Sequence, residues 1–160
     1  MCPTPTPNSN RSDSTGKSAT VTVFHVGPKD QDLRRLADIL NHAEWKLCPG
    51  TSWTVAGEES LSSAARSLQR QITPIVLCGG EPDSADWREV LESLASLPKP
   101  PMLIVASRMA DEYLWAEALN LGAHDVLSKP YQPAEVVRVL SMAWLHWMNR
   151  QPTGVLPRAS

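Results

Sequence analysis

The sequence predicts an α/β fold, an open, doubly wound, five-stranded parallel sheet with five helices. Strand-like and helix-like segments alternate along the chain, which is typical of parallel sheets. Residues 74–78 and 101–106 are apolar at every position, as expected for strands that helices cover on both faces. The length of 160 residues and the 42% hydrophobic content fit a single domain of ordinary size.

The first quarter of the domain contains the two predicted elements with the clearest patterns. Residues 20–26 are rich in β-branched side chains, which favours a strand. Residues 30–43 carry leucines at helical spacing. Residues 45–48 are a short apolar run before Pro49-Gly50 and are interpreted as the second strand, with residues 51–55 as a loop or a distorted extension of it.

The middle of the chain continues the alternation. Residues 58–70 and 85–97 each place apolar side chains on one helical face. The apolar strand at 74–78 lies between these two helices and ends at two glycines, and the strand at 101–106 follows the second helix.

The last three elements complete the pattern. Residues 111–121 form a predicted helix that Gly122 closes as a C-cap. Residues 126–128 form a short strand, and residues 133–149 form a helix that begins at a proline. Crossovers between parallel strands are right-handed, and ligands bind where the carboxyl ends of the strands meet.

Composition restricts the class of protein. A balance of 15 Lys and Arg against 17 Asp and Glu gives a net charge of −2, which argues against nucleic-acid binding through a broad basic surface. No apolar run approaches the roughly 18 residues of a membrane span, and no signal peptide is evident. Three widely spaced cysteines indicate free thiols, and therefore a cytoplasmic protein. We expect residues 1–18 to be a disordered leader, 19–149 the domain and 150–160 a flexible tail too short for an output domain.

One segment resembles a known family. Residues 102–130 combine an apolar strand, a Glu-Ala-Leu helix, a Gly-Ala pair with a following aspartate, and a terminal Lys-Pro. This segment strongly resembles the receiver domain of bacterial response regulators, which has a flavodoxin-like topology. The positions in register are Ala118, Leu119, Gly122, Ala123, Asp125, Leu127, Lys129 and Pro130.

The resemblance implies metal-assisted phosphoryl transfer within a two-component system or phosphorelay. In the family, an aspartate at the end of the third strand accepts the phosphoryl group from a phosphohistidine. Two acidic residues after the first strand hold Mg²⁺, and a Ser or Thr after the fourth strand and a Lys after the fifth bind the phosphoryl oxygens. A cis peptide before the proline that follows this lysine is also expected.

This sequence departs from the family at almost every one of those positions. Cys78 stands at the acceptor position, and Gly27-Pro28 replaces the acidic pair. Ala106 takes the Ser/Thr position, with Ser107 adjacent. Only Lys129, followed by Pro130, is retained. The nearby Asp30 and Asp32 are interpreted as helix N-terminal and solvated charges.

These departures predict a degenerate pseudo-receiver that is not an enzyme and needs no metal or cofactor. It would signal by protein–protein contact with a sensor kinase or another regulator. One alternative is a redox or thiol-reactive sensor at Cys78, with the thiol facing Lys129 and His25 as the one histidine placed to act as its base. Another alternative is a misaligned acceptor at Asp83 or Asp86.

The predicted docking face combines the fourth and fifth helices of the family with the strand between them. Receivers commonly pair through this face, so a homodimer is also expected. Exposed apolar side chains there would mark the contact surface, unless the leader or the tail covers them. The candidate residues are Tyr113, Trp115, Val139, Met142 and His146.

Overall fold

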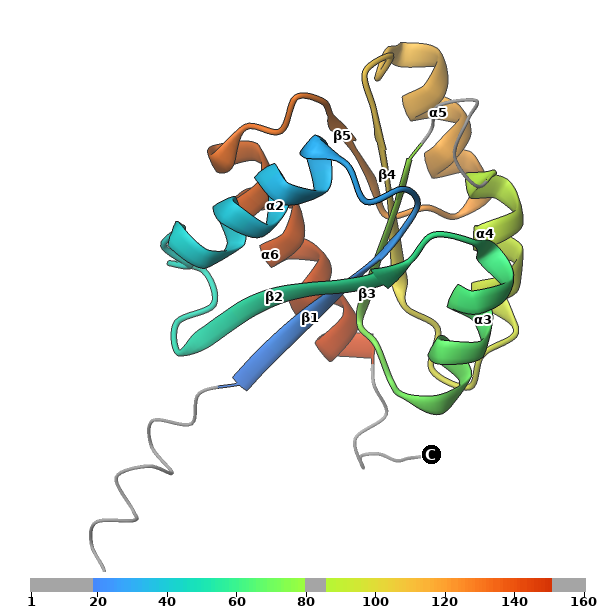
Figure 1. The fold of residues 1–160 in the computed structure, drawn as a ribbon, viewed down its shortest axis with the longest axis horizontal. Helices are drawn as coiled ribbons and strands as arrows, with labels where there is room; N and C mark the ends of the chain where they lie inside the picture. Colours follow the sequence, from blue (N-terminus) through green and yellow to red (C-terminus); the bar gives the residue numbers. More distant parts are fainter. Residues whose placement is uncertain (1–18, 80–85, 151–160) are drawn as a thin grey trace, which may run out of the picture.

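The computed structural model describes residues 19–79 and 86–150. A five-stranded sheet runs through the centre, in the order β2-β1-β3-β4-β5, with every neighbouring pair parallel. The predicted doubly wound sheet is thus confirmed (Figure 1). The strands are β1 (Ala19–Val26), β2 (Thr51–Glu58), β3 (Ile75–Gly79), β4 (Met102–Ser107) and β5 (Asp125–Ser128).

Five helices cover the two faces of the sheet in the described part of the chain. Helices α2 and α6 pack on one face, and α3, α4 and α5 pack on the other (Figure 1). None of them is long and apolar enough to cross a membrane. The helices are α2 (Gln31–His42), α3 (Leu61–Arg70), α4 (Trp87–Ala95), α5 (Glu112–Leu121) and α6 (Pro133–Arg150).

Side chains of the central strands alternate between the two faces. Ile75 and Leu77 of β3 lie in the core under α2 and α6, whereas Val76 and Cys78 lie in the core under α3, α4 and α5. All residues of β3 and β4 are buried. The continuous apolar runs therefore reflect burial on both faces, as the sequence predicts.

The second strand differs from the prediction. Residues 45–48 form a turn, and the strand is Thr51–Glu58, which begins after Pro49-Gly50. This strand lies at the edge of the sheet, where only Trp53 is fully buried, so it lacks an apolar pattern. The apolar run at 45–48 has another explanation: the ring of Trp45 stacks on that of Trp53, with the ring centroids 4.1 Å apart.

The boundaries of the other elements follow local chemistry. Ser60 caps α3, which therefore begins three residues after the predicted start at Glu58. Gly122 ends α5 in the left-handed conformation at φ 117°, as predicted. Arg150 still belongs to α6. The predicted leader, and the predicted tail beyond Arg150, lie outside the described residues.

Candidate functional site

An aspartate and two cationic side chains meet at the carboxyl edge of the sheet. Nη2 of Arg108 lies 2.8 Å from Oδ2 of Asp32, and Nζ of Lys129 lies 3.7 Å from the same oxygen. The Asp32 and Lys129 side chains are only 17% and 10% exposed. The interpretation of Asp32 as a solvated charge is therefore wrong. We call Asp32, Arg108 and Lys129 the edge cluster.

Three separate elements position the edge cluster. Asp32 lies in the first turn of α2, whose start is fixed by the Asp30 carboxylate accepting a hydrogen bond from the Leu33 backbone N–H at 3.2 Å. Asp30 thus fulfils the predicted role at a helix N-terminus. Arg108 directly follows β4 and Lys129 directly follows β5. Arg108 is not among the site residues predicted from the sequence, although its place after a buried strand was a usable signal.

His25 is the buried titratable group next to this cluster. The ring is on β1, two residues before Gly27, and a Cβ on Gly27 would lie 3.3 Å from its Cε1 atom. Burial above all, and then the charge of Lys129, lowers the pKa of His25 to about 4, against the opposing effect of Asp30 and Asp32. His25 is consequently neutral at pH 7.

A small cavity opens beside His25 at the ends of β1 and β2. It has a volume of about 190 Å³, which is below the range typical of sites for drug-sized ligands. Gly27 and Gly57 line it together with His25. A Cβ on Gly57 would overlap the carbonyl oxygen of His25, so the close approach of β1 and β2 requires glycine there.

Cys78 does not face the edge cluster. Its side chain is fully buried among the apolar residues under α3, α4 and α5, whereas Asp32 belongs to α2 on the other face. His25 pairs with Leu77, whose side chain lies in the core under α2 and α6. The thiol and the imidazole therefore point to opposite faces of the sheet, and the expectation that Cys78 faces Lys129 with His25 as its base is wrong.

Other positions that the family resemblance assigns to a phosphorylation site have structural roles. Ala106 is buried in the core, and the Ser107 hydroxyl accepts a hydrogen bond from the Met109 backbone N–H at 2.9 Å. Gly27 donates its backbone N–H to Glu58 O at 3.0 Å, while Pro28 is exposed. The Lys129-Pro130 peptide is cis, as expected from the resemblance.

Of the two alternative phosphoryl acceptors, only Asp86 lies among the described residues. Asp86 caps α4 by accepting a hydrogen bond from the Arg88 backbone N–H at 3.1 Å. Asp83 lies outside the described residues. Within residues 19–79 and 86–150, no group of three or more His, Cys, Asp or Glu side chains could hold a metal ion.

The predicted docking face is exposed on α5 and α6, with one correction. Tyr113 and Trp115 are 87% and 51% exposed, and Met142 is 48% exposed. The prediction that Val139 is a surface residue is wrong, because Val139 is fully buried, as are Val136 and Leu140. Spacings of three and four residues along α6 place Val136, Val139, Leu140 and Ala143 on one inward stripe. The prediction missed three exposed apolar residues of this region: Leu121, Leu145 and Met148.

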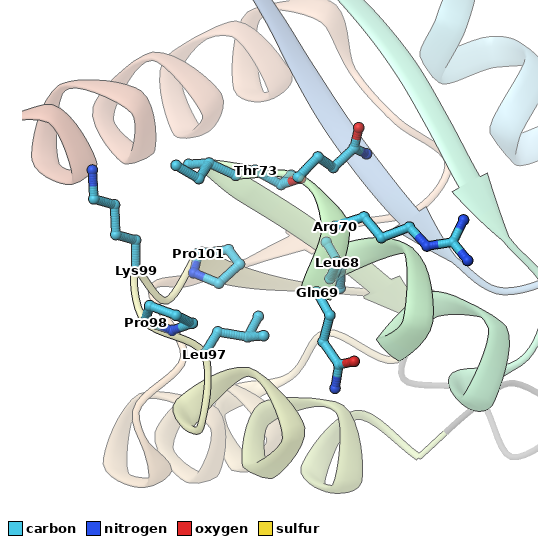
Figure 2. A pocket seen from close by; sticks show the side chains of 10 residues that line it. Leu68, Gln69, Arg70, Thr73, Leu97, Pro98, Lys99 and Pro101 are labelled. Atoms are coloured by element: carbon cyan, nitrogen blue, oxygen red, sulfur yellow. The ribbon is translucent and has the colours of Figure 1, made fainter.

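A second hollow lies at the opposite, amino edge of the sheet. Figure 2 shows apolar walls from Leu68, Leu97 and Pro101, with Arg70 and Lys99 at its sides. These residues precede β3 and β4 or end α3, so the hollow is separated from the edge cluster by the length of the strands. It contributes nothing to the site at the carboxyl edge.

Comparison with known proteins identifies the fold as that of response regulator receiver domains. The signal receiver domain of an HD domain-containing protein from Pseudomonas fluorescens Pf-5 matches with a TM-score of 0.64 and 21% identity, over 81% of this chain and 90% of that one. A CheY-like response regulator receiver domain protein from Methanospirillum hungatei JF-1 matches with a TM-score of 0.62 and 16% identity, over 83% of this chain and 100% of that one.

A curated protein with a similar sequence is the transcriptional regulatory protein CssR of Bacillus subtilis (strain 168). It is 28% identical over 132 residues, which cover 82% of this chain. The chain spans only 55% of the length of CssR. No protein-family model matches the sequence.

Proposed function

We propose that this protein is a signalling module of a two-component system or phosphorelay that acts without being phosphorylated. The observation that carries the proposal is the occupied Asp32 carboxylate. Arg108 binds both of its oxygens, at 2.9 and 2.8 Å, and Lys129 lies 3.7 Å away. Two side-chain cations thus already surround the carboxylate at the edge where receivers hold Mg²⁺.

Phosphoryl transfer requires a nucleophile and a bound metal ion that neutralises the developing charge. Cys78 is fully buried and faces the other side of the sheet. By alternation along β3, the residue that shares the face of Leu77 is Gly79, which has no side chain. These placements favour a protein that does not catalyse its own phosphorylation.

Protein contact would then carry the signal. Tyr113 and Trp115 on α5 and Met142 on α6 are apolar side chains that are about half exposed or more. We propose that they belong to one contact surface, since contiguous exposed apolar side chains mark interaction sites. The proposed partners are a sensor kinase or another regulator, and a second copy of the same chain is the proposed homodimer partner.

Acetyl phosphate with Mg²⁺ tests the absence of phosphorylation. We expect the intact mass to remain unchanged, while a receiver domain with a complete acidic cluster, treated in parallel, gains one phosphoryl group. A phosphoryl group that survives on this chain and maps to any aspartate of the described residues would contradict the proposal.

Binding measurements with matched surface variants test the docking face. Tyr113→Ser and Met142→Ser should each weaken binding to a cognate sensor kinase or regulator, or self-association. Ile72→Ser is the control, because Ile72 is 61% exposed but lies at the amino edge of the sheet. Equal losses for all three variants would contradict a docking surface on α5 and α6.

A further inference from the structure

Two histidines meet on the outer surface between β5 and α6. His124 immediately precedes β5 and His146 lies on α6, with ring centroids 5.3 Å apart and planes at 65°. They line an open hollow of about 570 Å³ with Met142, Leu145 and Met148. His146 is exposed, so its ring can turn without disturbing the core.

One nitrogen of the pair has no hydrogen bond. Nδ1 of His124 is buried and has no hydrogen-bond partner among the described residues. Buried polar atoms are nearly always paired, and each exception calls for an explanation. A neutral imidazole nitrogen without a hydrogen bond can donate its lone pair to a metal ion.

The separation of the rings fits two ligands of one ion. In a tetrahedral site, Zn²⁺ lies about 2.0–2.1 Å from each imidazole nitrogen, which places the centroids of two bound rings roughly 5 Å apart. The observed separation is 5.3 Å. Two histidines at this spacing can therefore bind one ion after a rotation of the exposed His146 ring.

We propose that His124 and His146 bind a late first-row transition metal ion, such as Zn²⁺, and that the same two residues of a second copy complete its coordination. Two imidazoles per chain supply half of a tetrahedral ligand set, and no larger ligand group exists among the described residues. A two-fold axis through the ion presents the same pair from both copies. Met142, Leu145 and Met148, which are 48%, 41% and 49% exposed, then surround the ion at an apolar interface.

This inference rests on the proposed function in one respect, because it assigns the partner and the bridging ion of the docking face. The experiment is a titration of the untagged full chain with zinc chloride at pH 7.5, followed by calorimetry and sedimentation velocity. We expect one zinc ion for every two chains, dimer formation on zinc addition, and reversal by EDTA.

The variants distinguish a built site from surface binding. His146→Asn should lower zinc affinity by at least about tenfold, the smallest loss typical of disturbing a metal site, and abolish zinc-dependent dimerisation. His42→Asn is the control, because His42 is an exposed histidine of α2 with Asp38 3.3 Å away. It should behave as the wild type. Since His146 is exposed, circular dichroism should show an unchanged fold.

Three results would overturn the inference: equal affinities of the wild type and His146→Asn, loss of zinc binding only in His42→Asn, or one zinc ion per monomeric chain. Dimerisation that persists in EDTA would also overturn the metal bridge, but it would leave the proposed docking function intact. A phosphoryl group gained from acetyl phosphate would contradict the proposed function without affecting the zinc site.

Discussion

Nη2 of Arg108 lies 2.9 Å from Oδ1 and 2.8 Å from Oδ2 of Asp32, although the two residues are 76 positions apart in the sequence. The contact joins the end of β4 to the first turn of α2. Lys129, after β5, adds a second cation 3.7 Å from the same carboxylate. Asp32 thus connects the first turn of α2 to the segments that follow β4 and β5.

Asp32→Asn should lower the free energy of unfolding by about 1–2 kcal/mol, because charged hydrogen bonds are lost around a carboxylate that is 17% exposed. Urea denaturation measures the change. Glu117→Gln is the matched control, since its pair with Arg88 spans 2.6 Å between side chains that are 48% and 43% exposed. The control should lose less than about 1 kcal/mol. Similar losses for both variants would show that the edge cluster is an ordinary surface ion pair.

His25 should make the protein less stable in mild acid. Its pKa is about 4 in the folded state and about 6.5 when unfolded, so between these values the unfolded chain binds a proton that the folded chain does not. The free energy of unfolding therefore falls as the pH drops from about 6.5 to 4, by roughly 3 kcal/mol at most.

The comparison of His25→Gln with the wild type isolates this effect from the titration of carboxylates. The variant should show a shallower loss of stability between pH 6.5 and 4 in denaturation series. His42→Gln changes an exposed histidine and should follow the wild type. Parallel curves for the wild type and His25→Gln would contradict a neutral, buried His25.

Val139 and Met142 lie three residues apart on α6 and should respond in opposite ways to truncation. Val139→Ala should lower the free energy of unfolding by about 1–3 kcal/mol, because it leaves space in a closed core. Met142→Ala should change stability by less than about 0.5 kcal/mol, since the side chain is 48% exposed. The measurement is chemical denaturation of both variants. Equal losses of stability would contradict the orientation of α6, which places Val139 in the core and Met142 on the surface.

The Cys78 thiol should resist alkylation in the folded protein. Its side chain is fully buried in the apolar core, so iodoacetamide reaches it only after unfolding. Peptide mapping compares the extent of Cys78 labelling in the native and the denatured protein. Cys48, which is 4% exposed, serves as an internal comparison. Fast labelling of Cys78 in the native protein, increasing with pH, would revive the thiol sensor as a candidate function.

The local sequence determined the sheet and most of its helices. Two short apolar runs predicted strands buried on both faces, and Gly122 and Pro133 marked helix boundaries that the structure contains. The second strand was misplaced because edge strands bury few side chains and leave little pattern in the sequence. The inward position of Val139 was missed because a helix with apolar residues on several sides has no unique stripe.

The sequence by itself determined which residue types stand after each predicted strand, because residue types can be read directly, and the family resemblance predicts from them that the positions associated with phosphorylation are mostly replaced. Only the tertiary structure decided that Asp32 is held by Arg108 and Lys129, that Cys78 points to the far side of the sheet, and that His124 meets His146. Each of these relationships depends on side-chain direction and on parallel strands that bring distant segments to one edge. The pattern within one segment predicts the periodicity of that segment, but it does not determine which side chains of distant segments meet.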